Sequence, residues 1–107
     1  MSVLMTLWVQ GNPDELERLA AQDPAGMRAI ADAAKEHGLI AHRFYGTDGQ
    51  IMVIDEWPDR ESFERFFESQ RATIGEMMAT AGVTGEPGIN FWRELETHDA
   101  VGWGAEG

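Results

Sequence analysis

Residues 41–57 read AHRFYGTDGQIMVIDEW and predict a β-hairpin. Two apolar runs of strand-like composition flank Asp48-Gly49, a dipeptide typical of a two-residue hairpin turn. Such a turn fixes the register and places His42 directly opposite Asp55. Opposed side chains of an antiparallel pair lie about 5 Å apart at Cβ. We therefore expect His42 and Asp55 to lie side by side on one face of a sheet.

The His42–Asp55 pair has two interpretations. In the functional one, Asp55 holds one ring nitrogen and leaves the other to act as a base or a hydrogen-bond donor in a pocket. In the structural one, the pair is a satisfied polar contact in a half-buried sheet. On the opposite face Arg43 lies opposite Ile54 and diagonal to Glu56. We expect Arg43 and Glu56 to form a structural or interface ion pair.

The rest of the chain extends this hairpin to a βαββαβ order. The expected elements are a strand over 3–9, a helix from Asn12-Pro13 to His37 with a kink or a second start at Asp23-Pro24, strands over 39–45 and 50–57, a helix from Pro58-Asp59 to Ala81, and a strand over 89–96. This order predicts an α+β, ferredoxin-like domain whose four-stranded antiparallel sheet carries two helices on one face. We assign 1–98 to that domain and 99–107 to a C-terminal tail.

Both faces of the predicted sheet are apolar, although helices cover only one. Leu4 and Trp8 alternate with Met5 and Leu7, and the third strand has apolar residues in both alternating sets. An exposed apolar face of that size normally marks an interaction site. A second copy of the same face is the simplest cover, so we expect a homodimer with two-fold symmetry.

Composition excludes several classes of function. The 107 residues contain no cysteine, which excludes a disulfide framework and a thiolate nucleophile and suits a cytoplasmic location. The formal net charge of −11 disfavours nucleic acid and anionic membrane surfaces as partners. No compact spacing of metal ligands and no nucleotide-binding motif occurs, so we expect neither a metal nor a cofactor.

Aromatic residues and methionines supply the candidate binding surface. The chain has four tryptophans, of which three lie on expected strands and are suited to lining a cavity for a flat ligand. Core packing is the alternative role for each of these side chains. The residues that we expect to contact a substrate are Trp57, Phe44, Phe67, Trp92 and Met77.

The sequence resembles the dimeric α/β-barrel superfamily, and within it the antibiotic biosynthesis monooxygenase (ABM)-like domains. The resemblance covers nearly the whole chain in element order and is most specific in Gly38, the strand after it, and the stretch IMVIDEWPDRESFERFF. Asp55-Glu56-Trp57 resembles the family's acid-x-Trp motif. The resemblance implies a barrel formed by two sheets, with a cavity between sheet and helices toward which His42, Asp55 and Trp57 point.

The resemblance leaves three functions open. The first is a cofactor-independent oxygenase in which His42, oriented by Asp55, deprotonates an aromatic or phenolic substrate. The second is a non-catalytic protein that binds a flat apolar ligand, and the third is a structural dimer. Haem-degrading relatives use an Asn, a Trp and a His; Trp57 matches the Trp, but Met5 and Leu7 occupy the first strand and no His lies near Phe67. Haem ligation by His42 would therefore need a different arrangement.

Overall fold

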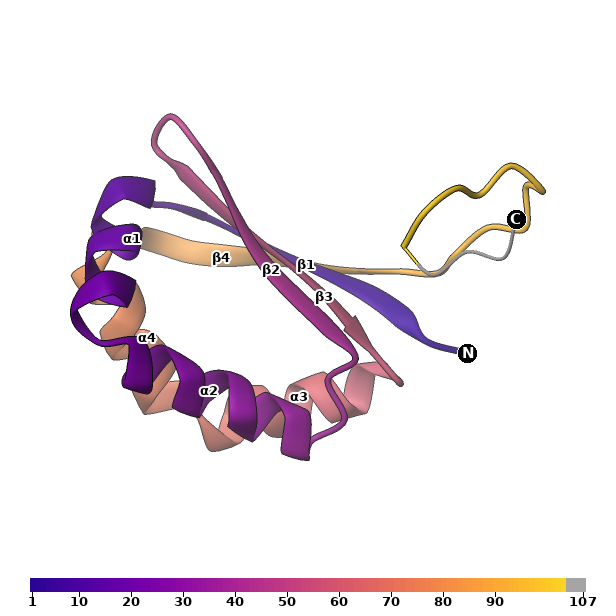
Figure 1. Ribbon diagram of the computed structural model, residues 1–107, viewed down its shortest axis with the longest axis horizontal. Coiled ribbons are helices and arrows are strands. Elements are labelled where there is room, and N and C mark those ends of the chain that lie inside the picture. The colour runs from indigo at the N-terminus through magenta and orange to yellow at the C-terminus, as the bar shows by residue number, and fades with distance from the viewer. Residues whose placement is uncertain (104–107) are drawn as a thin grey trace.

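The computed structural model describes residues 1–103, which form one four-stranded antiparallel sheet with the helices packed on one side of it (Figure 1). The elements in chain order are β1 (Val3–Gln10), α1 (Pro13–Gln22), α2 (Pro24–Glu36), β2 (Ala41–Thr47), β3 (Gln50–Trp57), α3 (Arg60–Ser69), α4 (Arg71–Thr80) and β4 (Thr84–Trp92). The strands lie in the order β2-β3-β1-β4. The ferredoxin-like βαββαβ arrangement predicted from the sequence is confirmed, with each long helical segment divided in two.

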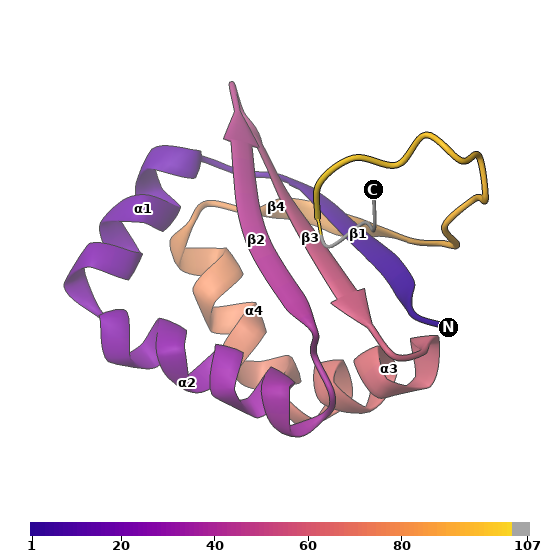
Figure 2. The same ribbon diagram turned by 45° about the vertical axis from the view of Figure 1, so that its right-hand side comes forward.

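The β2–β3 hairpin has the predicted register. Gly49 adopts a left-handed φ of 70°, as the second position of this tight turn requires. Thr47 pairs with Gln50, and His42 pairs with Asp55. The hairpin projects beyond the rest of the sheet at its turn (Figures 1 and 2).

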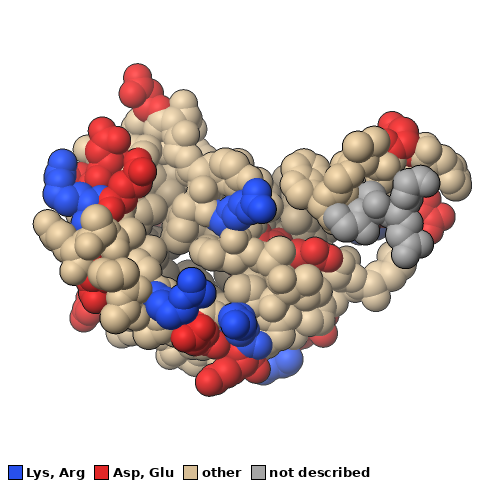
Figure 3. All heavy atoms as spheres, viewed as in Figure 1, with Lys and Arg blue, Asp and Glu red and all other residues tan. Residues whose placement is uncertain are grey.

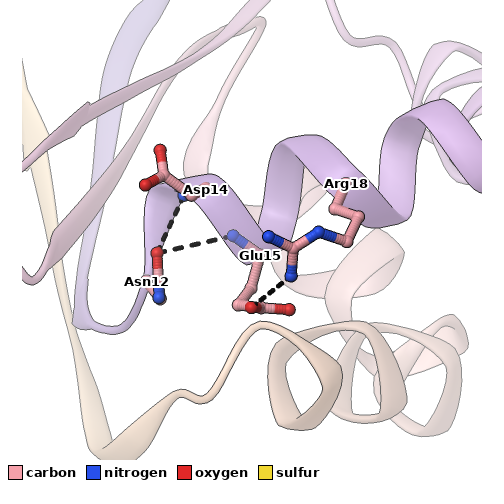
Figure 4. A network of polar contacts seen from close by, with 4 residues as sticks. All are labelled: Asn12, Asp14, Glu15 and Arg18. Carbon is pink, nitrogen blue, oxygen red and sulfur yellow. Dashed lines mark hydrogen bonds and ion pairs between the residues drawn. The ribbon is translucent and has the colours of Figure 1, made fainter.

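Capping residues begin and divide the first helical segment. The Asn12 side chain accepts hydrogen bonds from the backbone N–H groups of Asp14 (2.9 Å) and Glu15 (3.4 Å), and Arg18 pairs with Glu15 one turn later (Figure 4). Asp23 then ends α1 and caps α2 by accepting from the Gly26 N–H at 3.0 Å. The second helix start that the sequence predicts at Asp23-Pro24 is confirmed.

The second helical segment differs from its prediction as one continuous helix. It divides into α3 and α4 at Gln70, which has φ −115° and ψ 14°. The Ser69 hydroxyl donates to the Phe66 carbonyl oxygen at 2.8 Å. The Gln70 N–H still bonds to the same carbonyl at 3.1 Å, so the helical ladder of α3 continues to this residue and the break lies in the backbone angles of Gln70. No side chain caps the N-terminus of α4.

The last strand also begins and ends earlier than predicted. It spans Thr84–Trp92 rather than 89–96, and the segment 82–88 expected as a loop lies mostly within it. Trp92 pairs with Leu4, close to the first residue of β1. Beyond that pair β1 offers β4 almost no backbone to bond, so the strand ends there.

The core lies between the sheet and the helices. Alternate residues of β1 and β3 point into it, and Met5 and Trp57 are almost wholly excluded from solvent. Phe63 and Phe66 of α3 pack on the Trp57 ring, with centroid distances of 5.8 and 5.5 Å. Asp59 caps α3, and its bonds from the Ser62 hydroxyl and then the Ser62 backbone N–H lower the pKa of the Asp59 carboxyl.

The opposite face of the sheet, called the open face below, has no helix on it. Apolar side chains there remain exposed: Leu4 by 41%, Trp8 by 37%, Tyr45 by 46% and Trp92 by 53%. This confirms that the sheet is apolar on both sides and covered on one.

Acidic groups are spread over the side of the molecule shown in Figure 3 rather than gathered in one patch. In residues 1–103, no helix is both long and apolar enough to cross a bilayer.

Candidate active site

The candidate site begins with the predicted pair on neighbouring strands. His42 of β2 and Asp55 of β3 are direct partners in the register, and the Nδ1–Oδ1 distance is 2.6 Å. The Asp55 side chain is only 6% exposed, whereas the His42 side chain is 31% exposed. Because β2 is an edge strand, its imidazole reaches solvent while the carboxylate beneath it does not. The pair therefore joins a buried acceptor to an accessible ring.

Asp55 has a second partner on its own strand. The indole Nε1–H of Trp57 donates to Asp55 Oδ2 at 3.1 Å, and Trp57 has no solvent exposure. Residues i and i+2 of a strand share a face, which brings these two side chains together. Each carboxylate oxygen thus receives one hydrogen bond. In the described part of the chain, no buried side-chain nitrogen or oxygen lacks a partner.

These contacts define the roles of the two imidazole nitrogens. A carboxylate only accepts hydrogen bonds, so Nδ1 of His42 carries a proton and donates it to Asp55. In neutral imidazole the proton resides on one nitrogen, which leaves Nε2 with a free lone pair. Among residues 1–103, no hydrogen bond engages Nε2 of His42. That nitrogen is available to a ligand as an acceptor or a base.

A cavity of about 80 Å³ adjoins the pair, between the sheet and the helices. His42 and Asp55 are its only polar lining residues within the described chain, and the other lining side chains are aliphatic, methionine or phenylalanine. The volume is below the roughly 150 Å³ of an apolar cavity known to hold benzene. An aromatic ligand therefore requires the walls to move. Methionines are adaptable packing residues, and four of them line this cavity: Met5, Met27, Met77 and Met78.

The structure places the predicted binding residues in different positions. Phe44, Phe67 and Met77 line the cavity together with the His–Asp pair. Trp57 does not line it and reaches it only through Asp55. Helix residues that were not predicted as site residues complete the lining: Met27, Ile30, Phe63 and Phe66. Their helical spacing in the sequence was the signal that could have identified them.

Trp92 is a correction, because it lies on the open face and does not line the cavity. Its indole Nε1–H donates to the Thr6 hydroxyl at 2.9 Å, and the side chain is largely exposed. In β4 the pairing with β1 directs Phe91, the partner of Met5, toward the helices. Alternation along the strand then turns Trp92 the other way.

The expected Arg43–Glu56 ion pair is also corrected. Glu56 instead accepts a hydrogen bond from the Ser2 hydroxyl at 2.5 Å. Arg43 lies opposite Ile54 as predicted, but none of the ion pairs within residues 1–103 includes it. Ser2 reaches Glu56 because β1 pairs with β3 next to it, whereas Arg43 approaches only diagonally from the edge strand and remains in solvent.

A larger hollow lies elsewhere, between the start of α1 and the tip of the hairpin. It measures about 790 Å³ and is lined by residues that include Asp14, Glu17 and Asp48. These carboxylates are exposed, so water satisfies them and nothing orients them. We place the candidate site at the smaller cavity because only there is a titratable pair held by buried partners. Residues 1–103 contain no group of three or more His, Asp or Glu that could hold a metal ion.

Comparisons with known proteins find similar solved structures but no matching sequence family. No protein-family model matches the chain, and no curated protein matches it. Among solved structures it is similar to an antibiotic biosynthesis monooxygenase, with a TM-score of 0.62, 12% identity, and coverage of 87% of this chain and 98% of that one. SnoaB, a cofactor-independent oxygenase from Streptomyces nogalater, matches with a TM-score of 0.55, 17% identity and coverage of 90% and 97%.

A third neighbour is a protein described as dimeric. A dimeric ferredoxin-like protein from an uncultured marine organism matches with a TM-score of 0.62, 14% identity and coverage of 89% of each chain. At these identities the likeness shows the fold alone. The protein therefore has the ferredoxin-like fold of the ABM-like proteins, as its sequence predicts.

Proposed function

We propose that this protein is a cofactor-independent, monooxygenase-like enzyme that acts on an aromatic or phenolic molecule in the cavity beside His42. The observation that carries the proposal is the orientation of an accessible imidazole by a buried carboxylate at the wall of an otherwise apolar cavity. An apolar cavity with one polar pair suits a flat, neutral ligand that carries a single acidic hydrogen. The fold shared with a cofactor-independent oxygenase supports this class of reaction.

The chemistry assigned to His42 is proton transfer. Its Nε2 takes the acidic hydrogen of a phenol or enol, and Asp55 stabilises the imidazolium that results. The electron-rich anion then reacts with O₂ at carbon, the imidazolium returns its proton to the peroxide, and the hydroperoxide loses water to give a carbonyl. Written for the keto tautomer of the substrate, the balance R₂CH₂ + O₂ → R₂C=O + H₂O requires no external reductant. The apolar walls exclude bulk water from the anion.

Oxygen uptake with a panel of hydroxylated naphthalenes and anthracenes tests the proposal. Turnover with ¹⁸O₂ is expected to place one labelled oxygen in the product. His42→Ala is expected to lower kcat at least about a hundredfold, as loss of a general base does. His98→Ala, beyond the end of β4, is the matched control and leaves the rate unchanged. Equal rates for wild type and His42→Ala would remove His42 from the mechanism.

The second candidate is a non-catalytic protein that binds a flat apolar ligand. The same apolar lining favours it, because most of the cavity offers only packing contacts. A panel compound that raises the melting temperature of wild type without forming product, under air and over hours, would favour binding over catalysis. The purely structural alternative is weakened by the presence of a cavity beside His42.

We also propose that the protein is a homodimer whose two open faces meet. The support is the exposed apolar set on that face, which includes Leu4, Trp8 and Trp92. A dimeric ferredoxin-like protein with the same fold agrees with it. Burial of these side chains against a second copy stabilises the pair by the hydrophobic effect.

A further inference from the structure

We infer that Trp57 is a positioning residue that orients the Asp55 side chain, so that one of its oxygens always faces the Trp57 indole and the other faces His42 Nδ1. The inference starts from the two hydrogen bonds that Asp55 accepts, from His42 Nδ1 on one oxygen and from Trp57 Nε1 on the other. An indole nitrogen is a donor only. The oxygen that faces Trp57 must therefore be an acceptor under all conditions, which fixes the orientation of the carboxylate.

The surroundings of Trp57 make this donor rigid. The side chain is fully buried and packs against Phe63 and Phe66, so its ring has no room to turn. The other two described tryptophans of the sheet make a similar bond under different conditions. Trp8 donates to Gln50 and Trp92 donates to Thr6, both on the open face, where the single subunit leaves both indoles partly exposed. Among these three indoles, only that of Trp57 bonds to a buried acceptor. That acceptor, Asp55, also bonds to the His42 imidazole.

The consequence for His42 follows from the donor count. Trp57 holds one oxygen of Asp55 and so leaves the other facing His42. Because a carboxylate oxygen only accepts, the ring holds its proton on Nδ1, and Nε2 keeps the free lone pair. The positioning role in catalysis rests on the proposed function, whereas the tautomer is a property of the protein without substrate.

Asp55→Asn gives the sharpest consequence. The amide has one acceptor and one donor group, and Trp57 forces the amide oxygen toward the indole. The NH₂ group then faces His42 and donates to Nδ1. The imidazole proton is displaced to Nε2, and the base disappears although the side-chain volume is unchanged.

Long-range ¹H–¹⁵N correlation NMR of the imidazole, at a pH where His42 is neutral, reads the tautomer directly. Wild type is expected to show the Nδ1–H form and Asp55→Asn the Nε2–H form. Asp55→Asn/Trp57→Phe is expected to show a mixture, because the amide is then free to turn. Trp8→Phe and Trp92→Phe make the same chemical change on the open face and should leave the Nδ1–H form intact.

Two results would overturn the inference: Nδ1–H retained in Asp55→Asn, or the same tautomer in Asp55→Asn with and without Trp57→Phe. If the double variant fails to fold, Asp55→Asn alone decides, because it keeps the size of the side chain. In turnover assays Trp57→Phe should lower kcat roughly tenfold with little change in KM, the pattern of lost orientation. If the NMR spectra show the expected tautomers but neither wild type nor any variant turns over a substrate, the proposed function is contradicted and the inference about Trp57 is not.

Discussion

The two faces of the sheet make the same hydrogen bond in opposite surroundings. On the helix-covered face the Trp57 indole donates to the buried Asp55, and on the open face the Trp8 indole donates to the exposed Gln50. A buried polar group is tolerated only when it is fully partnered. The covered face therefore holds its polar groups in one geometry, which suits chemistry. The open face leaves its groups free to exchange partners, which suits association.

Removing the hydrogen-bond acceptor on each face should give the largest difference in stability between the two faces. Asp55→Ala is expected to lower the free energy of unfolding by about 3 kcal/mol, because it leaves the N–H of the buried Trp57 without an acceptor. In the dissociated subunit Gln50→Ala should cost less than about 0.5 kcal/mol, since water replaces the lost partner. Urea unfolding at a protein concentration low enough to keep the dimer dissociated measures both. Equal costs would mean that the two faces do not differ in the way described.

A charge placed on the open face tests its role in association. Leu4→Glu is expected to weaken the dimer roughly a hundredfold, about 2.7 kcal/mol, because a carboxylate would be buried between two copies. Ala29→Glu adds the same charge on the exposed surface of α2 and should leave the dimer unchanged. Sedimentation velocity over a range of concentrations measures the association. A wild-type protein that stays monomeric throughout would contradict the proposed dimer.

Two glycines, one within α4 and one just after it, test the backbone conformation of the helices that cover the sheet. Gly75 lies within α4, and an added Cβ would meet no atom within 4 Å. Gly75→Ala should therefore stabilise the protein by about 0.5–1 kcal/mol, because alanine loses less backbone entropy in a helix. Gly82 has the same free space but a φ of +72°. Gly82→Ala should destabilise the protein by about 1 kcal/mol, and thermal or urea unfolding that gave both the same sign would refute the argument.

The smallest expected effect is the acid response of the α3 cap. Hydrogen bonds from Ser62 lower the pKa of Asp59 below its unfolded value of 3.8. The sign follows: the stabilisation is complete above the unfolded pKa and is lost as pH falls through the folded one. Asp59→Asn keeps a good capping residue but does not titrate there. Its unfolding free energy should fall less between pH 5 and pH 2 than that of wild type, and parallel curves would contradict the assignment.

Local rules made the hairpin and its polar pair predictable. Asp48-Gly49 fixed the turn, and the two-residue period of strands then fixed His42 opposite Asp55. The same period contained the signal for the Asp55–Trp57 bond, because residues two apart share a face. Trp92 was not predictable in this way, since its direction depends on how β4 pairs with β1, and the register shifts between Trp8 and Gln10.

The other differences lie where apolar periodicity carries no signal. Gln70 divides α3 from α4 through its backbone angles, while the apolar spacing runs on across both helices. The predicted Arg43–Glu56 ion pair is absent from the described residues, and Glu56 accepts from the Ser2 hydroxyl, which the pairing of β1 with β3 brings beside it. Contacts of this kind depend on tertiary geometry, whereas the hairpin depends on neighbours along the chain.

Methyl NMR of the six methionines tests most directly whether the helix-covered face binds the ligand and the open face forms the dimer. Four of them line the cavity, while Met52 pairs with Trp8 and Tyr45 on the open face. We predict that 1-naphthol shifts the methyl signals of Met5, Met27, Met77 and Met78 and leaves Met52 in place. Dilution toward the monomer should shift Met52 and leave those four unchanged. A 1-naphthol response at Met52 without one at the cavity methionines would contradict the placement of the ligand site.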